Sequence, residues 1–139
     1  GMSLVVEGEA MQPRPGHTGS VELQTNFHPL WSEGMQLYWK DFKPGDKLSL
    51  AFDSEVEGIY YAKIQFTVAP DYGTFALRVN DKVITPEINL TNEEVSLLLV
   101  NLGQVNLKKG ENELQIESAA LASGHDTGFF GIDKLTLRK

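Results

Sequence analysis

The sequence contains no cysteine, and it is poor in basic residues. Without cysteine there are no disulfide bonds, thiolate metal sites or cysteine nucleophiles, so stability must come from packing. Its 12 Lys and Arg face 19 Asp and Glu, which gives a net charge of -7. Phosphate contacts need clustered Lys and Arg, and the only local concentration is Lys108-Lys109. Composition therefore argues against a nucleic-acid partner.

Long hydrophobic runs are missing as well. No apolar stretch approaches the ~20 residues of a membrane-spanning helix, so no membrane association is expected. With 139 residues, of which 41% are hydrophobic, the chain suits a single domain over residues 3–139. In Gly1-Met2, the glycine resembles a residue left by tag removal ahead of a starting Met. No signal peptide is visible.

The clearest pattern is the period-two alternation that begins in residues 58–73, GIYYAKIQFTVAPDYG. Tyr60, Ala62, Ile64, Phe66 and Val68 share one face, and polar residues share most of the other. Such a strand of roughly ten residues spans about 33 Å, enough to cross a whole domain. The pattern predicts a central strand with one buried side, ended by the turn in residues 70–73.

Further alternating segments are separated by turn residues every eight to twelve positions. Residues 111–122 contain enough Glu, Leu and Ala for a helix, but their alternation and the preceding turn favour a strand. Residues 95–107 are apolar in both parities, which predicts a strand covered on both sides, with Gly103 marking a bulge. About eight short strands and no convincing helix predict an all-β fold, an antiparallel β-sandwich of jelly-roll type.

Several short motifs occur in an order that covers nearly the whole chain. They are Glu7-Gly8-Glu9, Trp31-Ser32 before residues 36–39, Pro44-Gly45-Asp46, Gly58-Ile59-Tyr60, residues 69–73 (APDYG) and residues 130–135 (FGIDKL). In this order they resemble galactose-binding-domain-like modules, and in particular the β-sandwich modules appended to bacterial glycoside-processing enzymes. The resemblance implies a jelly-roll sandwich that acts as a non-catalytic accessory module, extracellular or periplasmic in location.

The chain also resembles calcium-bearing carbohydrate-binding modules, in which the first strand carries Glu-x-Glu and the last strand opens with Asp. Glu7, Glu9 and Asp133 match that pattern, which implies a structural Ca²⁺. In those modules an Asn just before the last strand often meets the sugar, and here Gly131 stands two positions before Asp133.

The residues themselves give a reason to expect a cation near Asp133. Asp133 shares a parity with Leu135 and Leu137, so a core-facing strand would bury its carboxylate. A buried carboxylate must be met by donors or by a cation, and Ca²⁺ takes six to eight oxygen ligands. The alternative is that Asp133 accepts backbone N–H bonds or pairs with Arg138 or a lysine.

Aromatic residues form the second candidate site. Sugar rings stack their C–H faces on flat aromatic side chains, while polar neighbours bond the hydroxyls. Alternation elsewhere already supplies a core, so Trp31 and Tyr72 are predicted to be exposed where loops gather. The candidate ligand-binding residues are Trp31, Tyr72, His125, Asp126 and Phe129. The alternative is that most of these aromatic side chains belong to the core.

Catalysis has little support in the sequence. His17, His28 and His125 lie far apart, without the spacing of a metal-hydrolase site. The acidic pairs Glu55/Glu57 and Glu93/Glu94 border turns, where carboxylates are usually solvated. Together with the resemblance to appended β-sandwich modules, this predicts a carbohydrate-binding accessory module of a secreted bacterial glycan-degrading system, partnered by a glycan. The alternative is an interaction module that packs against a neighbouring catalytic domain or its own copy without binding sugar.

Overall fold

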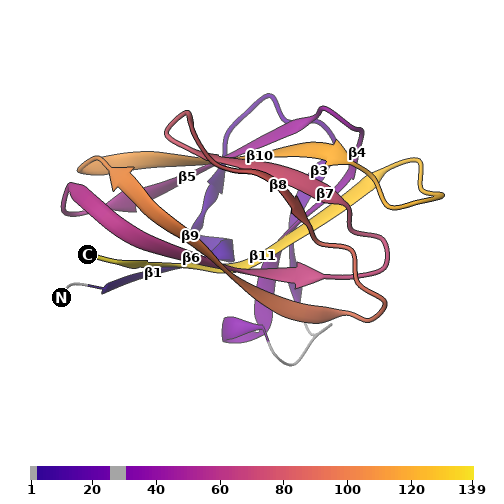
Figure 1. The fold of residues 1–139 in the computed structure, drawn as a ribbon, viewed down its shortest axis with the longest axis horizontal. Coiled ribbons are helices and arrows are strands. Elements are labelled where there is room, and N and C mark those ends of the chain that lie inside the picture. Colours follow the sequence, from indigo (N-terminus) through magenta and orange to yellow (C-terminus); the bar gives the residue numbers. More distant parts are fainter. Residues whose placement is uncertain (1–2, 26–30) are drawn as a thin grey trace.

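The chain folds into two antiparallel β-sheets packed face to face. A computed structural model describes residues 3–25 and 31–139. The larger sheet has six strands in the order β3-β4-β11-β6-β9, with β1 also paired to β11, and the smaller has the order β2-β5-β10-β7-β8. Figure 1 shows the two layers, with β5 and β10 above β6 and β11. The predicted antiparallel jelly-roll sandwich is confirmed.

The strands follow one another along the chain with two short 3-10 turns between them. The six-stranded sheet contains β1 (Ser3–Glu7), β3 (Ser20–Thr25), β4 (Met35–Phe42), β6 (Gly58–Val68), β9 (Ser96–Leu107) and β11 (Gly128–Arg138). The five-stranded sheet contains β2 (Gln12–Pro13), β5 (Lys47–Ser54), β7 (Thr74–Val79), β8 (Lys82–Asn89) and β10 (Gly110–Ala120). The turns are η1 (Gly8–Ala10) and η2 (Ser32–Gly34).

β6 is the interior strand that its alternation predicts. Its neighbours are β11 and β9, and Tyr60, Ala62, Ile64 and Phe66 are all at most 2% exposed. They pack against buried side chains of the other sheet, among them Leu50 and Ile116. The hydrophobic core therefore fills the space between the two sheets, and the opposite face of β6 looks outward.

The ambiguous residues 111–122 are strand rather than helix, because β10 covers residues 110–120 and pairs with both β5 and β7. The prediction for residues 95–107 is wrong in one respect. β9 is a strand, but it lies at the sheet edge, and Leu99 is 56% exposed. In β9, apolar residues on both faces of the strand therefore accompany an exposed position at the sheet edge. The predicted bulge is present, since Gly103 has φ of 75° where the pairing with β6 shifts.

A second bulge in β11 sets the direction of Asp133. Ile132 pairs with Phe66, and Leu135 pairs with Ile64. Three residues along β11 therefore correspond to two residues along β6. The extra residue reverses the parity, and Asp133 faces outward, on the same side as Gln65. The expectation that Asp133 shares the core face with Leu135 and Leu137 is wrong because strict alternation does not survive a bulge.

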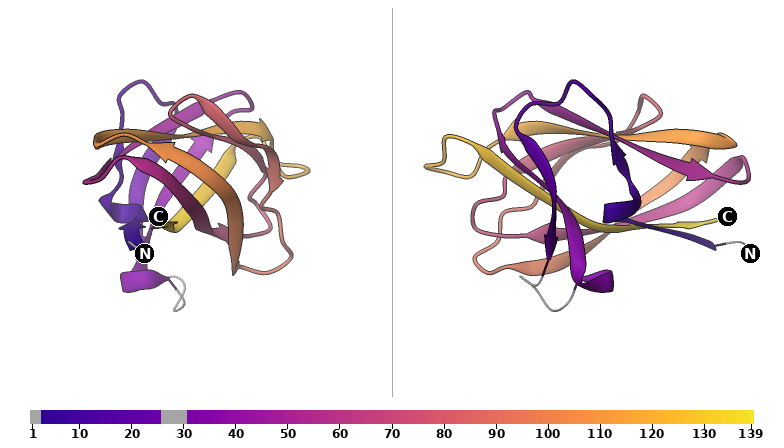
Figure 2. Two further views of the ribbon diagram at one scale, coloured as in Figure 1. Left: turned by 60° about the vertical axis from the view of Figure 1, so that its left-hand side comes forward. Right: turned by 180° about the vertical axis from the view of Figure 1, so that it is seen from behind.

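Ser3, the first described residue, lies beside Arg138 because β1 and the end of β11 are paired (Figure 2). Within residues 3–25 and 31–139, no helix combines the length and apolarity needed to cross a membrane. The interpretation of Gly1-Met2 as a tag remnant and the position of His28 both fall outside the described residues.

Candidate functional site

The candidate site lies on the outer face of the six-stranded sheet. In β4, Leu37 and Trp39 are at most 1% exposed and belong to the core. Period-two geometry therefore turns Gln36 and Tyr38 to the outer face. The residues that cover this face come from the loop before β4, from β6 and from the turn after β6.

Five side chains are joined here by hydrogen bonds. Trp31 Nε1 donates to Thr67 Oγ1 at 2.9 Å, and Thr67 Oγ1 donates to Gln36 Oε1 at 2.5 Å. Gln36 Nε2 in turn donates to the Tyr72 hydroxyl at 3.2 Å and to Gln24 Oε1 at 2.8 Å. The chain of bonds fixes both aromatic rings, because each polar end has a buried partner.

The predicted exposure of Trp31 and Tyr72 is wrong. Trp31 is 3% exposed and Tyr72 is 4% exposed. Trp31 bonds Thr67, and Tyr72 bonds Gln36 while its ring packs with buried hydrophobic residues. The prediction assumed that Trp31 and Tyr72 were not needed for burial, because the alternating strands already supply a core. It did not consider that Thr67 and Gln36, which face outward, provide hydrogen-bond partners that let Trp31 and Tyr72 be buried outside that core.

The accessible aromatic surface is formed instead by Tyr38 and Phe129. Both are partly exposed, and their rings are nearly parallel, at 12° with centroids 6.3 Å apart. On its other side Tyr38 stacks with Tyr72, at 23° and 6.5 Å. Phe129 was predicted from sequence as a ligand-binding residue, and its partly exposed position is compatible with that role.

Negatively charged side chains act on the Tyr38 hydroxyl. Burial raises the pKa of Tyr38 to about 12, and the negative charges of Asp71, Asp41 and Glu22 add to this effect. Glu22 also pairs with Lys40, the next outward-facing residue of β4, with Nζ 3.1 Å from Oε1. An aromatic surface bordered by charged acceptors and an ammonium donor can stack a sugar ring and bond its hydroxyls.

The cavity enclosed beneath Tyr38 is small, at about 70 Å³. Its lining includes Gln24, Trp31, Thr67 and Asp71. Small-molecule pockets usually measure about 300–1,000 Å³, so a sugar ring does not fit inside. A ligand at this site must therefore lie on the open surface of Tyr38 and Phe129.

Gly131 gives the Gln36 amide its position. Gly131 is buried on the outer face of β11, next to β4, and a Cβ atom there would collide with the amide group of Gln36. Gln36 thus holds its amide against the backbone of β11 at Gly131. Its side chain is fully buried, so it orients Tyr72 and Thr67 rather than meeting ligand directly.

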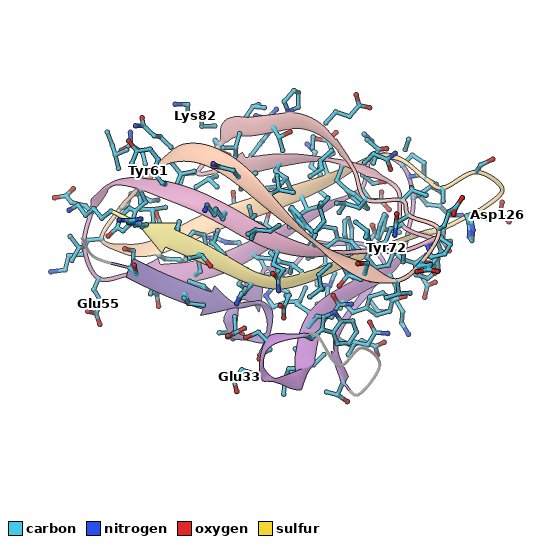
Figure 3. The ribbon with its side chains drawn as sticks, turned by 60° about the horizontal axis from the view of Figure 1, so that its bottom comes forward. Glu33, Glu55, Tyr61, Tyr72, Lys82 and Asp126 are labelled. Atoms are coloured by element: carbon cyan, nitrogen blue, oxygen red, sulfur yellow. The ribbon has the colours of Figure 1, made fainter. Side chains whose placement is uncertain are left out.

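His125 and Asp126 lie in the loop between β10 and β11, and both are exposed. Lys43 Nζ donates to the Asp126 carbonyl oxygen at 3.1 Å, and His125 N donates to the Ala122 carbonyl. Figure 3 places Asp126 at the tip of this projecting loop, apart from Tyr72. The structure therefore brings Tyr72 and Phe129 together through Tyr38, whereas Asp126 lies apart from Tyr72.

Two of the three predicted metal residues, Glu7 and Asp133, share Ser32 as a hydrogen-bond donor near the end of β1, and Glu9 follows in η1. Ser32 Oγ donates to Glu7 Oε1 at 2.7 Å, while Ser32 N donates to Asp133 Oδ1 at 2.9 Å. Gln65 Nε2 donates to Asp133 Oδ2 at 2.7 Å. A Cβ atom at Gly8 would collide with the Ile132 carbonyl oxygen. The lack of a side chain at Gly8 therefore lets the η1 turn pack closely against β11.

Two carboxylate oxygens of this cluster have no hydrogen-bond partner among the described residues. They are Glu7 Oε2 and Glu9 Oε1, and both are buried. Burial raises the pKa of Glu9, and the charges of Glu7, Asp133 and Glu33 raise it further. Burial likewise raises the pKa of Asp133, against the opposing hydrogen bonds from Gln65 and Ser32.

The expected first strand differs in one detail. β1 ends at Glu7, and Glu9 lies in the η1 turn rather than on the same strand face. Among the described residues, no three His, Cys, Asp or Glu side chains are already arranged to hold a metal ion. The cluster nevertheless offers unpartnered acidic oxygens, which are the donors that Ca²⁺ prefers.

Residues considered for catalysis remain scattered. His17 Nδ1 is hydrogen-bonded to the Arg14 carbonyl, at a distance of 3.0 Å, and His125 lies in the exposed loop. Glu55, Glu57, Glu93 and Glu94 are all exposed, as predicted for solvated carboxylates.

A larger hollow of about 640 Å³ lies around the β7–β8 turn, but none of the described residues that line it is aromatic. Its Arg14 is already held by Glu111, with Nη2 2.7 Å from Oε2. This hollow lacks the stacking surface that a sugar site needs.

No protein-family model matches the chain, and no curated protein sequence matches it either. Solved structures do match over nearly its full length. A family 35 carbohydrate-binding module from an environmental isolate aligns with a TM-score of 0.66 and 19% identity, over 98% of this chain and 93% of that one. The chain has the fold of these modules.

A second family 35 module, from Clostridium thermocellum, gives a TM-score of 0.64 at 12% identity, covering 99% of this chain and 98% of that one. A Paenibacillus xanthan lyase gives a TM-score of 0.81 at 15% identity, over 97% of this chain. The chain spans only 13% of the lyase's length. This sandwich therefore occurs both as a separate module and as a small part of a long enzyme.

Several residues of the site escaped the sequence prediction. Gln36, Thr67 and Tyr38 carry the outer face, and Asp71 borders it. Their signal was present in the alternation, because residues opposite a core-facing parity must face outward. The alternation does not show which of these outward-facing residues will be covered by a loop that is distant in the sequence.

Proposed function

We propose that this chain is a carbohydrate-binding module whose sugar site is the Tyr38–Phe129 surface. The single observation that carries the proposal is this nearly parallel, partly exposed ring pair bordered by Asp71, Asp41 and Glu22. Sugar C–H faces stack on such rings, and carboxylates accept hydrogen bonds from sugar hydroxyls. The fold shared with family 35 carbohydrate-binding modules supports it.

In this role the chain performs no chemistry and serves a secreted bacterial glycan-degrading system, extracellular or periplasmic. Its neighbour in the full-length protein is then a catalytic domain, which the module holds near its polysaccharide. The support is the same fold's occurrence within a xanthan lyase and the scatter of its histidines. The nearly parallel rings, and the hydrogen-bonded Trp31 and Tyr72 behind them, form a rigid surface that loses little freedom on binding.

We further propose a structural Ca²⁺ held by Glu7, Glu9 and Asp133. Two buried unpartnered oxygens and two raised carboxyl pKa values indicate a site where negative charge is under-compensated. A bound cation would supply that compensation and tie the start of the chain to β11. The cluster also holds Ser32, next to Trp31, so the ion would stiffen the loop that covers the sugar-binding face.

The sugar-binding role is tested with a panel of immobilised plant and bacterial polysaccharides in affinity electrophoresis. The proposal expects retarded migration on at least one polysaccharide. A variant with Tyr38→Ala should migrate freely on that gel while its circular dichroism spectrum still shows the folded sandwich. Free migration of the wild-type chain on every polysaccharide would contradict the proposal.

The interaction-module alternative is favoured by one observation, the edge strand β9. Its 12 residues, SLLLVNLGQVNL, contain no charged side chain, and Leu98 and Leu99 are 38% and 56% exposed. Edge strands of this kind readily pair with another chain. Sedimentation velocity distinguishes the functions, because a concentration-dependent dimer that Leu99→Lys abolishes would support association through β9.

A further inference from the structure

A groove crosses the outer face of the six-stranded sheet at the end opposite the Tyr38–Phe129 surface. It has a volume of about 510 Å³, and its lining includes Tyr61, Lys63, Asn101, Thr136, Arg138 and Lys139. Figure 3 shows Tyr61 and Tyr72 at opposite ends of the molecule. The groove is therefore separate from the candidate site already described.

Strand register places the groove residues in two neighbouring rows. Arg138 pairs with Tyr61, and Tyr61 with Gln104, in one row across β11, β6 and β9. Two residues further along β6, Lys63 is paired with Thr136 on one side and with Asn101 on the other. The strands are about 4.8 Å apart and the rows about 7 Å apart, so these side chains form one continuous surface.

Tyr61 is held in the groove as an open aromatic surface. Its side chain is 56% exposed, while Gln104 Nε2 donates to its hydroxyl at 3.1 Å. The hydrogen bond restrains the ring from the hydroxyl end and leaves its faces accessible. A restrained, accessible tyrosine is a surface on which a sugar ring can stack.

The groove is positively charged in a chain that carries a net charge of -7. None of the described residues that line it is acidic. Across residues 3–25 and 31–139, ion pairs involve Arg14, Lys40 and Lys47 but neither Lys63 nor Arg138. Lys139 Nζ donates to the backbone carbonyl of Glu57 at 3.0 Å, so it keeps its full charge at the groove margin.

We propose that this groove binds a negatively charged polysaccharide, with carboxylate or sulfate groups. The proposal rests on the glycan-binding role and adds a second site to it. Tyr61 stacks with a sugar ring, Arg138 takes an acidic group through paired N–H donors, and Lys63 adds a second positive charge. Asn101 and Thr136 supply hydrogen-bonding groups for sugar hydroxyls.

The test measures binding of three probes by isothermal titration: short polygalacturonate oligomers, dextran sulfate and neutral cello-oligosaccharides. The proposal expects an acidic probe to bind at low salt and to weaken steeply between about 0.01 M and about 1 M salt, as the Debye length falls from ~30 to ~3 Å. The combined change Lys63→Glu and Arg138→Glu should weaken binding about tenfold or more. Preference between the two acidic probes identifies the charged group.

Two controls separate a glycan site from simple ion exchange. Lys82→Glu combined with Lys109→Glu changes the net charge equally at exposed positions outside the groove, and should leave binding unchanged. Tyr61→Ala removes the aromatic surface without changing charge, and should weaken binding of the same probe. If Tyr61→Ala binds like wild type, or if the control pair weakens binding equally, the assignment of a glycan to this groove is wrong.

The two sites fail independently. If Tyr61→Ala weakens the binding of acidic probes while no glycan binding depends on Tyr38, the groove proposal is supported and the Tyr38–Phe129 site is overturned. If binding depends on Tyr38 alone and no acidic probe binds the groove, the groove proposal is overturned and the proposed function remains.

Discussion

The amide of Gln36 occupies the space directly over Gly131, where any other residue would place its Cβ atom. Gly131 pairs directly with Tyr38, and Gln36 lies two positions from Tyr38 along β4. Because Gln36 also bonds Thr67 and Tyr72, the absence of a side chain at position 131 makes room for these hydrogen bonds.

This contact predicts that Gly131→Ala destabilises the fold by about 1–3 kcal/mol, the usual cost of inserting a methyl group into packed surroundings. Urea unfolding measures the change. In a Gln36→Ala background the obstructing amide is gone, so the same Gly131→Ala change should cost clearly less. Equal costs in both backgrounds would show that Gln36 and Gly131 are not coupled.

Calcium binding predicts a metal-dependent stability. If Glu7, Glu9 and Asp133 hold an ion bound only by the folded state, Ca²⁺ at 100 times its dissociation constant stabilises the fold by about 2.7 kcal/mol. Thermal melts of metal-stripped protein, with and without Ca²⁺, measure the effect. Asp133→Ala should abolish the difference, whereas Glu55→Gln, at an exposed carboxylate elsewhere, should preserve it. Identical melts of stripped wild-type protein with and without Ca²⁺ would exclude the ion.

The raised pKa values predict a pH dependence of the metal-free protein. The pKa of Glu9 is raised from 4.5 and that of Asp133 from 3.8, so the folded state holds these protons more tightly than the unfolded state does. Their contribution to stability is full below those ordinary values and is lost as pH rises through the raised ones. With chelator present, Glu9→Gln should therefore gain stability relative to wild type as pH rises above 4.5. A constant difference across that range would contradict the shift for Glu9.

The sandwich could be predicted from sequence because alternation is a local property. Ile64, Phe66 and their neighbours reveal the buried face of β6 without knowledge of any other strand. The same reasoning chose a strand over a helix for the residues that became β10. Where the pattern is apolar on both sides, as at Leu98 and Leu99, it does not distinguish a covered strand from an exposed edge.

The site was harder to predict because it depends on contacts between distant segments. Trp31 meets Thr67 across 36 positions, and no local pattern announces that pairing. The bulge at residues 132–134 reverses the direction of Asp133, and the assignment of Glu7, Glu9 and Asp133 to a calcium site stays a prediction. The sequence could identify Phe129 as a candidate ligand-binding residue. That Tyr38 stacks beside it follows only from the register between β4 and β11.

The central claim is that a sugar stacks on Tyr38 and Phe129. The most direct test is a calorimetric titration, with a glycan that retards the wild-type chain, of three proteins: wild type, Tyr38→Ala and Tyr61→Ala. We expect wild-type affinity between millimolar and micromolar, equivalent to about 4–8 kcal/mol. For a neutral glycan, Tyr38→Ala should bind at least about tenfold more weakly, a loss of about 1.4 kcal/mol, while Tyr61→Ala should bind like wild type. Unchanged affinity in Tyr38→Ala would contradict the account.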